Sequence, residues 1–188
     1  MHNEARARLR KARQDAGLTL RELAGKIGVS TSLLSQVERG SSQPSVASLY
    51  ALTSALGVSL DAVMSAGARE PNVAPGFDEG PVVRQGTRSQ LEMTAGVVWE
   101  QLTQGEDPID DALLVSYSQG SKSASDGALM THAGREYAYV LQGDLTLHFR
   151  FKTIVMHAGD SLAFDSSNPH LYSNDGATVA RAVFFVVS

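Results

Sequence analysis

The sequence predicts a two-domain α plus β protein, in which five short helices precede an antiparallel β-barrel. Up to residue 64, apolar residues recur at the three- and four-residue spacing of a helix face. Beyond residue 82 they form short runs rich in β-branched and aromatic residues, which favour strands. Tyr50 is the sole aromatic residue before residue 66. We therefore expect a helical domain at 1–65, a linker at 66–81 and a β domain at 82–188.

Residues that start and end helices divide the N-terminal segment into five. Thr19 and Glu22 have the spacing of a capping box, and Ser30, Ser45 and Ser59 stand where N-caps are expected. A glycine follows each of the first four predicted helices. Helices this short are stable only when packed together, so the sequence predicts a bundle.

Residues 19–38, TLRELAGKIGVSTSLLSQVE, place two helices around a tight turn, which is the spacing of a helix-turn-helix. Leu34 and Val37 of the second helix are expected to face inward. The outward residues are short, polar and almost uncharged, whereas an exposed helix usually carries Lys and Glu. Hydroxyl and amide groups can bond base edges, so this face could enter a major groove, the alternative being an ordinary polar face. The outward residues are Thr31, Ser32, Ser35, Gln36 and Arg39.

Residues 9–64 resemble the XRE-type, or lambda-repressor-like, helix-turn-helix family. The shared motifs are GLTLRELA, GVS, LSQVERG, PS and ALGVSL. The resemblance implies an ion pair between Arg13 and Glu38, with a structural role for Glu38. One such domain makes few base contacts, so we expect a homodimer on double-stranded operator DNA, with half-sites roughly 34 Å apart.

The same resemblance implies which side chains contact DNA. Base contacts specify the site, whereas phosphate contacts position the domain. The expected base contacts are Thr31, Ser32 and Gln36, and the residues expected nearer the phosphates are Ser30, Ser35, Arg39 and Ser41.

The C-terminal segment reads as a series of short strands separated by turns such as Gly143-Asp144, Gly159-Asp160 and Asp175-Gly176. Many short strands at this spacing predict a sandwich or barrel. The final segment, ending FFVVS, is apolar at successive positions, so we expect it to be buried on both faces. The predicted strands span 81–87, 95–103, 112–119, 136–143, 144–151, 152–159, 160–167, 169–174 and 178–188.

Two stretches of this segment resemble the cupin family. His132-Ala-Gly-Arg-Glu136 followed by YAYVLQG is similar to the first cupin motif, and GDSLAFDSSNPH, ending at His170, is similar to the second. The resemblance implies a double-stranded β-helix, or jelly-roll barrel. A cupin barrel after an XRE-type domain is a familiar regulator architecture.

In metal-binding cupins the first motif supplies two histidines and a glutamate, and the second supplies a third histidine. Met130 stands at the first of these positions, which leaves His132, Glu136 and His170. A thioether is a soft, weak ligand, but two histidines and a carboxylate can still form a facial triad for divalent Zn, Fe, Mn or Ni. The alternative is that the three groups hydrogen-bond one another or a ligand.

Strand alternation predicts a pocket around these groups. If Glu136 points inward, so do Ala138 and Val140, and if His170 points inward, so does Tyr172. Trp99 and Tyr117 are further candidates. His148 and His157 lie outside both motifs and are expected to be surface or core residues. The residues expected to line a small-molecule effector site are Met130, His132, Glu136, Ala138, Val140, His170 and Tyr172.

Composition narrows the class of protein. Residues 1–65 carry eight Lys and Arg against five Asp and Glu, and residues 66–188 carry eight against fifteen, so the helical domain is the positive part of an acidic chain. The chain has no cysteine, which is typical of a reducing compartment. No apolar run approaches a membrane span, so we expect a cytoplasmic protein without a membrane partner.

We therefore expect a ligand-responsive transcription regulator and not an enzyme. The first alternative is a metal-dependent cupin dioxygenase or isomerase with an accessory DNA-binding domain. The second is a barrel that serves only dimerisation, whose interior would be filled by its own side chains.

Overall fold

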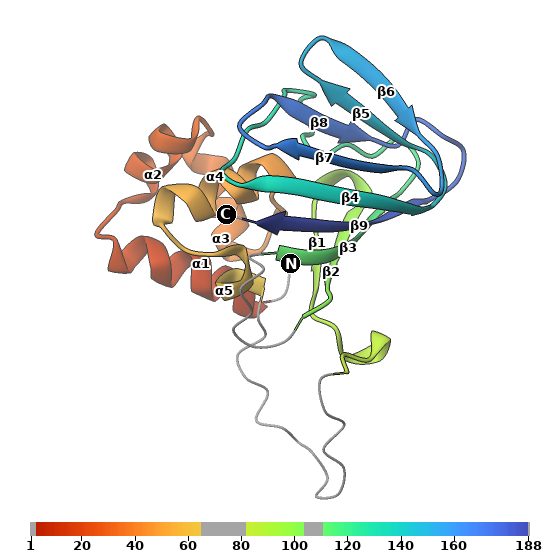
Figure 1. Ribbon diagram of the computed structural model, residues 1–188. Helices are drawn as coiled ribbons and strands as arrows, with labels where there is room; N and C mark the ends of the chain where they lie inside the picture. The colour runs from red at the N-terminus through yellow and green to blue at the C-terminus, as the bar shows by residue number, and fades with distance from the viewer. Residues whose placement is uncertain (1–2, 65–81, 104–110, 188) are drawn as a thin grey trace, which may run out of the picture.

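The computed structural model describes residues 3–64, 82–103 and 111–187 (Figure 1). The predicted linker at 66–81 lies outside the described residues, so the predicted domain boundaries remain predictions. In the described part of the chain, a helical bundle is followed by an antiparallel β structure, as the sequence predicts. No helix in that part is long and apolar enough to cross a membrane.

The N-terminal domain is a bundle of five helices. Its core consists of apolar side chains from all five, including the fully buried Leu23, Leu49 and Val63. The helices are α1 (Asn3–Asp15), α2 (Leu20–Ile27), α3 (Thr31–Arg39), α4 (Val46–Leu56) and α5 (Leu60–Met64).

The predicted helix caps are all present. The hydroxyl of Thr19 accepts from the amide of Glu22, whose carboxylate accepts in return from the amide of Thr19, which completes the capping box. Ser30, Ser45 and Ser59 accept amide hydrogen bonds in the first turns of α3, α4 and α5. Left-handed glycines follow α1 to α4, so the divisions predicted from the sequence are confirmed.

The C-terminal domain consists of two antiparallel sheets that form a jelly-roll barrel. One sheet has six strands in the order β1-β2-β3-β9-β4-β7, and the other has three in the order β6-β5-β8. The strands are β1 (Gln90–Glu92), β2 (Val97–Gln101), β3 (Asp111–Tyr117), β4 (Arg135–Gln142), β5 (Leu145–Phe149), β6 (Lys152–Met156), β7 (Ser161–Asp165), β8 (His170–Ser173) and β9 (Ala180–Val187).

Two expectations about the strands are wrong. The strand predicted at 81–87 is replaced by a 3-10 turn at Gln85–Thr87, closed by the amide and hydroxyl of Thr87 on the carbonyl of Arg84. The short strand β1 follows it and was not predicted. The last strand is not buried on both faces, because Phe185 and Val187 are 37% and 38% exposed. Although β9 lies centrally in its sheet, only one side faces the barrel interior.

The helical domain lies against one end of the barrel, with α4 nearest to it (Figure 1). Two backbone hydrogen bonds join the domains there. The amide of Ala47 donates to the carbonyl of Ser123 at 3.2 Å, and the amide of Thr94 donates to the carbonyl of Pro44 at 3.0 Å. The N-terminal end of α4 is therefore docked on the barrel.

Candidate functional site: a recognition helix and a buried His-Glu-His cluster

The helix α3 presents the polar face that the sequence predicts. Leu34 and Val37 are buried in the bundle, whereas Thr31, Ser32 and Gln36 are exposed. The division follows from helical spacing, which places the apolar pair on one side of α3. The outer face of this helix is therefore free to approach another surface.

The other residues predicted to contact DNA flank this face. Arg39 is exposed at the end of α3, and Ser35 is half-buried. The hydroxyl of Ser30 caps α3 by accepting from the amide of Leu33 at 3.1 Å, and that of Ser41 donates to the carbonyl of Gln36 at 3.4 Å. Both serines thus stabilise the helix ends in addition to any contact with phosphate.

A buried ion pair fixes α3 against α1. The guanidinium of Arg13 donates two hydrogen bonds to the carboxylate of Glu38, at 2.6 Å and 2.9 Å. It also donates to the carbonyl of Leu18 at 2.8 Å. The bond to Glu38 raises the pKa of Arg13. The pairing implied by the family resemblance is confirmed, and it is structural.

Inside the barrel, His132, Glu136 and His170 come together from two parts of the chain. His132 precedes β4, Glu136 lies on β4, and His170 begins β8. The Nε2 atoms of His132 and His170 lie 3.3 Å and 3.8 Å from the same Glu136 oxygen, Oε2. One candidate ligand atom from each residue lies within 4.8 Å of those of the other two. These three side chains are at most 5% exposed.

The two imidazoles are oriented by backbone carbonyls. The Nδ1 atom of His132 is 3.0 Å from the carbonyl of Ala133, and that of His170 is 2.8 Å from the carbonyl of Asn168. A carbonyl only accepts, so each Nδ1 carries the proton, and in the neutral ring Nε2 keeps its lone pair. Both Nε2 atoms are buried without a hydrogen-bond partner. This is the arrangement that orients histidine ligands in metal sites.

The other oxygen of the central carboxylate is held by a tyrosine. The hydroxyl of Tyr172 donates to Oε1 of Glu136. Burial, together with the charge of Glu136, raises the pKa of Tyr172 well above its usual value, so the phenol keeps its proton. Burial lowers the pKa of His170, which favours the neutral ring that a metal ion requires.

The cluster fits a divalent metal ion in the chemistry of its donors. Two neutral imidazoles and one carboxylate are the ligands of a facial triad. Tyr172 bonds Oε1 of Glu136, so Oε2, which lies nearest the histidines, is available to a metal ion. Met130 bonds through its backbone to His170 and lines the adjacent cavity. The His132, Glu136 and His170 cluster could therefore hold an ion.

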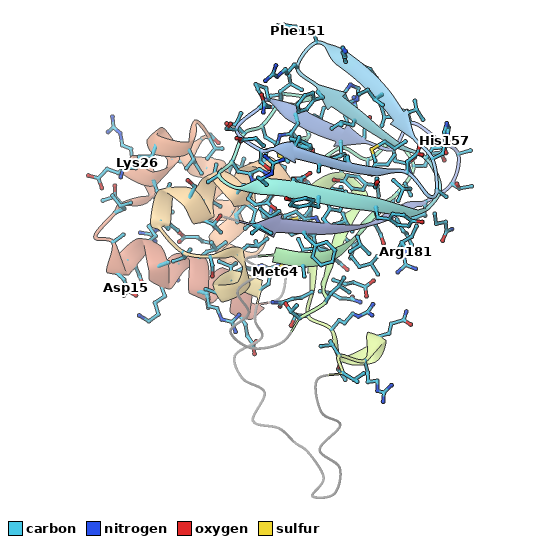
Figure 2. The ribbon with its side chains drawn as sticks, viewed as in Figure 1. Asp15, Lys26, Met64, Phe151, His157 and Arg181 are labelled. Atoms are coloured by element: carbon cyan, nitrogen blue, oxygen red, sulfur yellow. The ribbon has the colours of Figure 1, made fainter. Side chains whose placement is uncertain are left out.

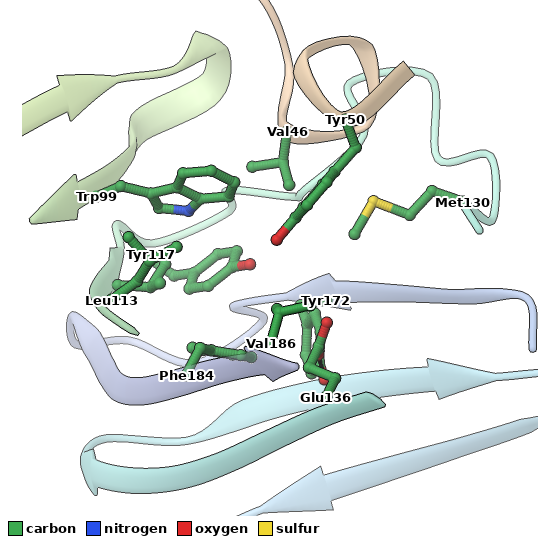
Figure 3. Close-up of a pocket in the computed structure, with 11 residues that line it drawn as sticks. Val46, Tyr50, Trp99, Leu113, Tyr117, Met130, Glu136, Tyr172, Phe184 and Val186 are labelled. Carbon is green, nitrogen blue, oxygen red and sulfur yellow. Dashed lines mark hydrogen bonds between the residues drawn. The ribbon is translucent and has the colours of Figure 1, made fainter. Parts of the chain in front are cut away.

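The cavity beside the cluster differs in part from the predicted pocket. Met130, Glu136 and Tyr172 line it, as do Trp99 and Tyr117 (Figure 3). Its volume is about 20 Å³, which is room for one water molecule. The remaining lining residues are Val46, Tyr50, Leu113, Val115, Phe184 and Val186.

Buried and exposed side chains alternate along β4 as predicted, but not every buried residue of that face lines the cavity. Ala138 and Val140 are buried on the same side of β4 as Glu136, but they do not line this cavity. His148 bonds Ser173 and His157 pairs with Asp144, so neither belongs to the cluster.

Two cavity residues were not predicted because they belong to the helical domain. Val46 and Tyr50 reach the cavity from α4 (Figure 3). The ring of Tyr50 stacks on that of His132, with centroids 4.2 Å apart and planes 3° apart, and it meets the edge of Trp99 at 5.7 Å. The isolated aromatic residue in a helical domain was the one sequence signal for this contact.

Comparison with known proteins matches each domain to a family. Residues 9–63 match the helix-turn-helix family model, and residues 114–187 match the cupin domain model. The chain is 26% identical over 176 residues to the HTH-type transcriptional regulator PuuR of Escherichia coli, covering 94% of this chain and 90% of PuuR. It is 26% identical over 171 residues to the HTH-type transcriptional regulator SutR of the same organism, covering 89% and 85%.

A solved structure shares the architecture. The HTH_3 family transcriptional regulator from Vibrio cholerae superimposes with a TM-score of 0.69 at 20% identity, over 99% of this chain and 96% of that one. At this identity the likeness concerns the fold. It extends over both domains, in agreement with the two family matches.

Proposed function

Because this chain belongs to the helix-turn-helix transcriptional regulators that carry a C-terminal cupin domain, we propose that its barrel is a sensor that controls operator binding. One observation carries the proposal: the Nε2 atoms of His132 and His170 are buried without a partner beside Glu136. Buried polar atoms without a partner are costly and rare. A divalent ion, or a small polar ligand, would satisfy both.

The small cavity volume favours the alternative of a barrel that serves only dimerisation, because the interior is nearly filled by side chains. The two partnerless imidazole nitrogens favour a sensor, since they lie beside the same carboxylate as a set of metal ligands would. The dimerisation alternative predicts no bound ion, so an ion bound at the cluster would contradict it.

Metal binding is tested with the full chain, stripped of metal and titrated with Zn²⁺, Mn²⁺, Ni²⁺ or, without oxygen, Fe²⁺. Native mass spectrometry and calorimetry should detect one ion per chain, lost in His170→Ala. The matched control is His148→Ala, because His148 bonds Ser173 and lies outside the cluster. Equal metal content in the two variants would contradict the site.

The sensing step requires that an occupant of the barrel change DNA affinity, because binding at two coupled sites is reciprocal. We propose that the cluster senses and does not catalyse, in keeping with the regulator names of the relatives. The rival is a metal-dependent dioxygenase or isomerase. If operator affinity stays the same across ligands shown to occupy the barrel, sensing fails.

We propose that Thr31, Ser32 and Gln36 read bases, and that Ser30, Ser35, Arg39 and Ser41 lie nearer the phosphates. The exposure of Thr31, Ser32 and Gln36 on a single face of α3 supports this assignment. An operator is selected from random duplex DNA with the full chain. A bidentate base contact contributes about 1–3 kcal/mol, so Gln36→Ala should weaken operator binding roughly 5- to 150-fold.

Arg39→Ala should weaken binding to all sequences alike, since a phosphate contact carries no sequence information. Gln142→Ala, an exposed glutamine on the barrel, is the control and should change nothing. If Gln36→Ala binds the operator as the unaltered chain does while Arg39→Ala weakens all DNA equally, Gln36 is not a base reader.

We propose a homodimer formed through the outer face of the six-stranded sheet. Tyr137, Tyr139, Phe185 and Val187 are 37–49% exposed there, on the adjacent strands β4 and β9. Contiguous apolar surface of this kind is typical of interfaces. A second copy is the occupant that a domain reading two half-sites requires.

Tyr139→Lys should therefore yield monomers in sedimentation and weaken operator binding. Ile154→Lys is the control, because Ile154 is 43% exposed on the other sheet. A dimer that survives Tyr139→Lys but dissociates with Ile154→Lys would place the interface on the three-stranded sheet.

A further inference from the structure

The cavity of the barrel is closed on one side by the DNA-binding domain. Tyr50 and Val46 of α4 form that side (Figure 3), and the backbone of Ala47 is bonded to Ser123 of the barrel. The remaining lining residues belong to the barrel, several of them on β3 and β9, which are paired with neighbours on both sides. The wall contributed by α4 can leave without breaking a sheet.

The space available in the cavity is too small for an organic ligand of several heavy atoms in the present arrangement of its walls. A volume of about 20 Å³ holds one water molecule. A metal ion needs little additional room, but an occupant with several heavy atoms must displace a wall. Tyr50 covers one face of His132 and contacts Trp99, so its ring stands directly over the cluster.

The backbone of Tyr50 cannot move far by itself, because its helix is part of the bundle core. Leu49 and Leu52 of α4 are 0% and 2% exposed, and α4 packs against α1, α2 and α5. Displacing α4 therefore carries the recognition helix with it. Interiors this tightly packed move as units and do not deform continuously.

We infer that Tyr50 is the lid of the barrel site, and that an occupant larger than a water molecule undocks the DNA-binding domain from the barrel. This inference rests on the proposed sensing function and specifies how that function operates. Occupancy by a ligand of this size and docking exclude each other, so the ligand acts by its differential affinity for the undocked state.

The role of Tyr50 as a lid can be tested without knowing the ligand, by a substitution that fills the cavity with a larger side chain. Val186→Phe adds a ring at a lining position on β9. The chain has no cysteine, so spin labels at Lys26→Cys and Phe151→Cys report the distance between the two domains (Figure 2). Both labelled positions are exposed and lie far from the cavity residues in sequence.

The Val186→Phe chain should show the interlabel distance shifted and broadened, as an undocked domain would. Adding Tyr50→Ala should restore the narrow distribution, because removal of the phenol makes room for the new ring. Tyr50→Phe should not restore it, since it retains the ring. A Val186→Phe chain with the unaltered distance distribution, or one that Tyr50→Ala does not rescue, would overturn the lid.

Tryptophan fluorescence supplies a second measurement. Trp99 is the sole tryptophan of the chain and is 3% exposed. Its quenching by acrylamide should rise in Tyr50→Ala and stay unchanged in Ser54→Ala, an exposed position on the same helix. Unchanged quenching in Tyr50→Ala would contradict the covering role of Tyr50.

A Co²⁺ titration of the same unlabelled variants separates this inference from the proposed function. If Co²⁺ does not bind while Val186→Phe undocks the domain and Tyr50→Ala rescues it, the lid stands and metal sensing fails. If Co²⁺ binds through His170 but the domains of the Val186→Phe chain stay docked, metal binding stands and the lid is refuted.

Discussion

Two ion pairs of the helical domain have the same separation, 2.6 Å, but differ in burial, and they should therefore differ in energy. The side chains of Arg13 and Glu38 are 11% and 8% exposed, whereas those of Lys11 and Asp15 are 74% and 62% exposed. Breaking a buried pair leaves an uncompensated charge, at a cost of about 3–5 kcal/mol. Exposed pairs along one helix contribute about 0.3–0.5 kcal/mol.

Glu38→Ala should lie at the lower end of its range, about 3 kcal/mol, because Arg13 keeps its hydrogen bond to the carbonyl of Leu18. For a domain of this size that free energy lowers Tm by roughly 12–24 °C. Asp15→Ala should lower Tm by only about 1–4 °C. Circular dichroism at a helical wavelength measures both in the full chain.

The same reasoning predicts an asymmetry between breaking the pair and replacing it. Arg13→Met combined with Glu38→Leu removes both charges and fills similar volume, so the double variant should be much more stable than Glu38→Ala alone. Equal Tm shifts for Glu38→Ala and Asp15→Ala, or a double variant as unstable as Glu38→Ala, would refute the idea that burial and not distance determines the energy of these ion pairs.

Two further predictions concern a cap and a glycine. Thr19→Ala should destabilise α2 by about 1 kcal/mol, measured by thermal unfolding. The amide and hydroxyl of Thr19 lower the pKa of Glu22 in the folded chain, so the contribution of the Glu22 carboxylate to stability is present above its unfolded-state pKa and is lost as pH falls through its folded-state pKa. A carboxyl titration by NMR should show the Glu22 pKa rising in Thr19→Ala. Gly143→Ala should destabilise the barrel more than Gly159→Ala: both have positive φ, but only at Gly143 would a Cβ meet a backbone oxygen, that of Val179, at 2.6 Å. Equal unfolding midpoints for the two glycine variants would contradict this.

The helices could be predicted accurately because their ends depend on contacts within four residues. Thr19 and Glu22 are three positions apart, and each capping serine bonds an amide three residues on. The positions of the helix ends can therefore be predicted from short stretches of sequence. The barrel strands were predicted where alternation was clear, as along β4, and missed where three residues of β1 owe their conformation to pairing with β2.

For the buried cluster, the sequence could predict which residues belong to it but not how their side chains are arranged. The motif resemblance brought His132, Glu136 and His170 together, and the structure agrees. It could not indicate that both Nδ1 atoms would meet backbone carbonyls, because loops at Ala133 and Asn168 determine this. The motif resemblance also could not predict the contact of Tyr50 with His132. That contact joins two domains, and no periodic pattern in the sequence indicates it.

The position of His132 places the proposed sensing site and the contact between the domains on one side chain. Its Nε2 atom lies 3.3 Å from Oε2 of Glu136, and Tyr50 covers one flat face of its ring. An ion bound at Nε2 engages that atom without touching the covered face, so a metal alone should leave the domains docked. A ligand that completes the coordination of such an ion must enter beside the cluster, where Tyr50 stands. The metal would then prime the site, and the organic ligand would release the DNA-binding domain.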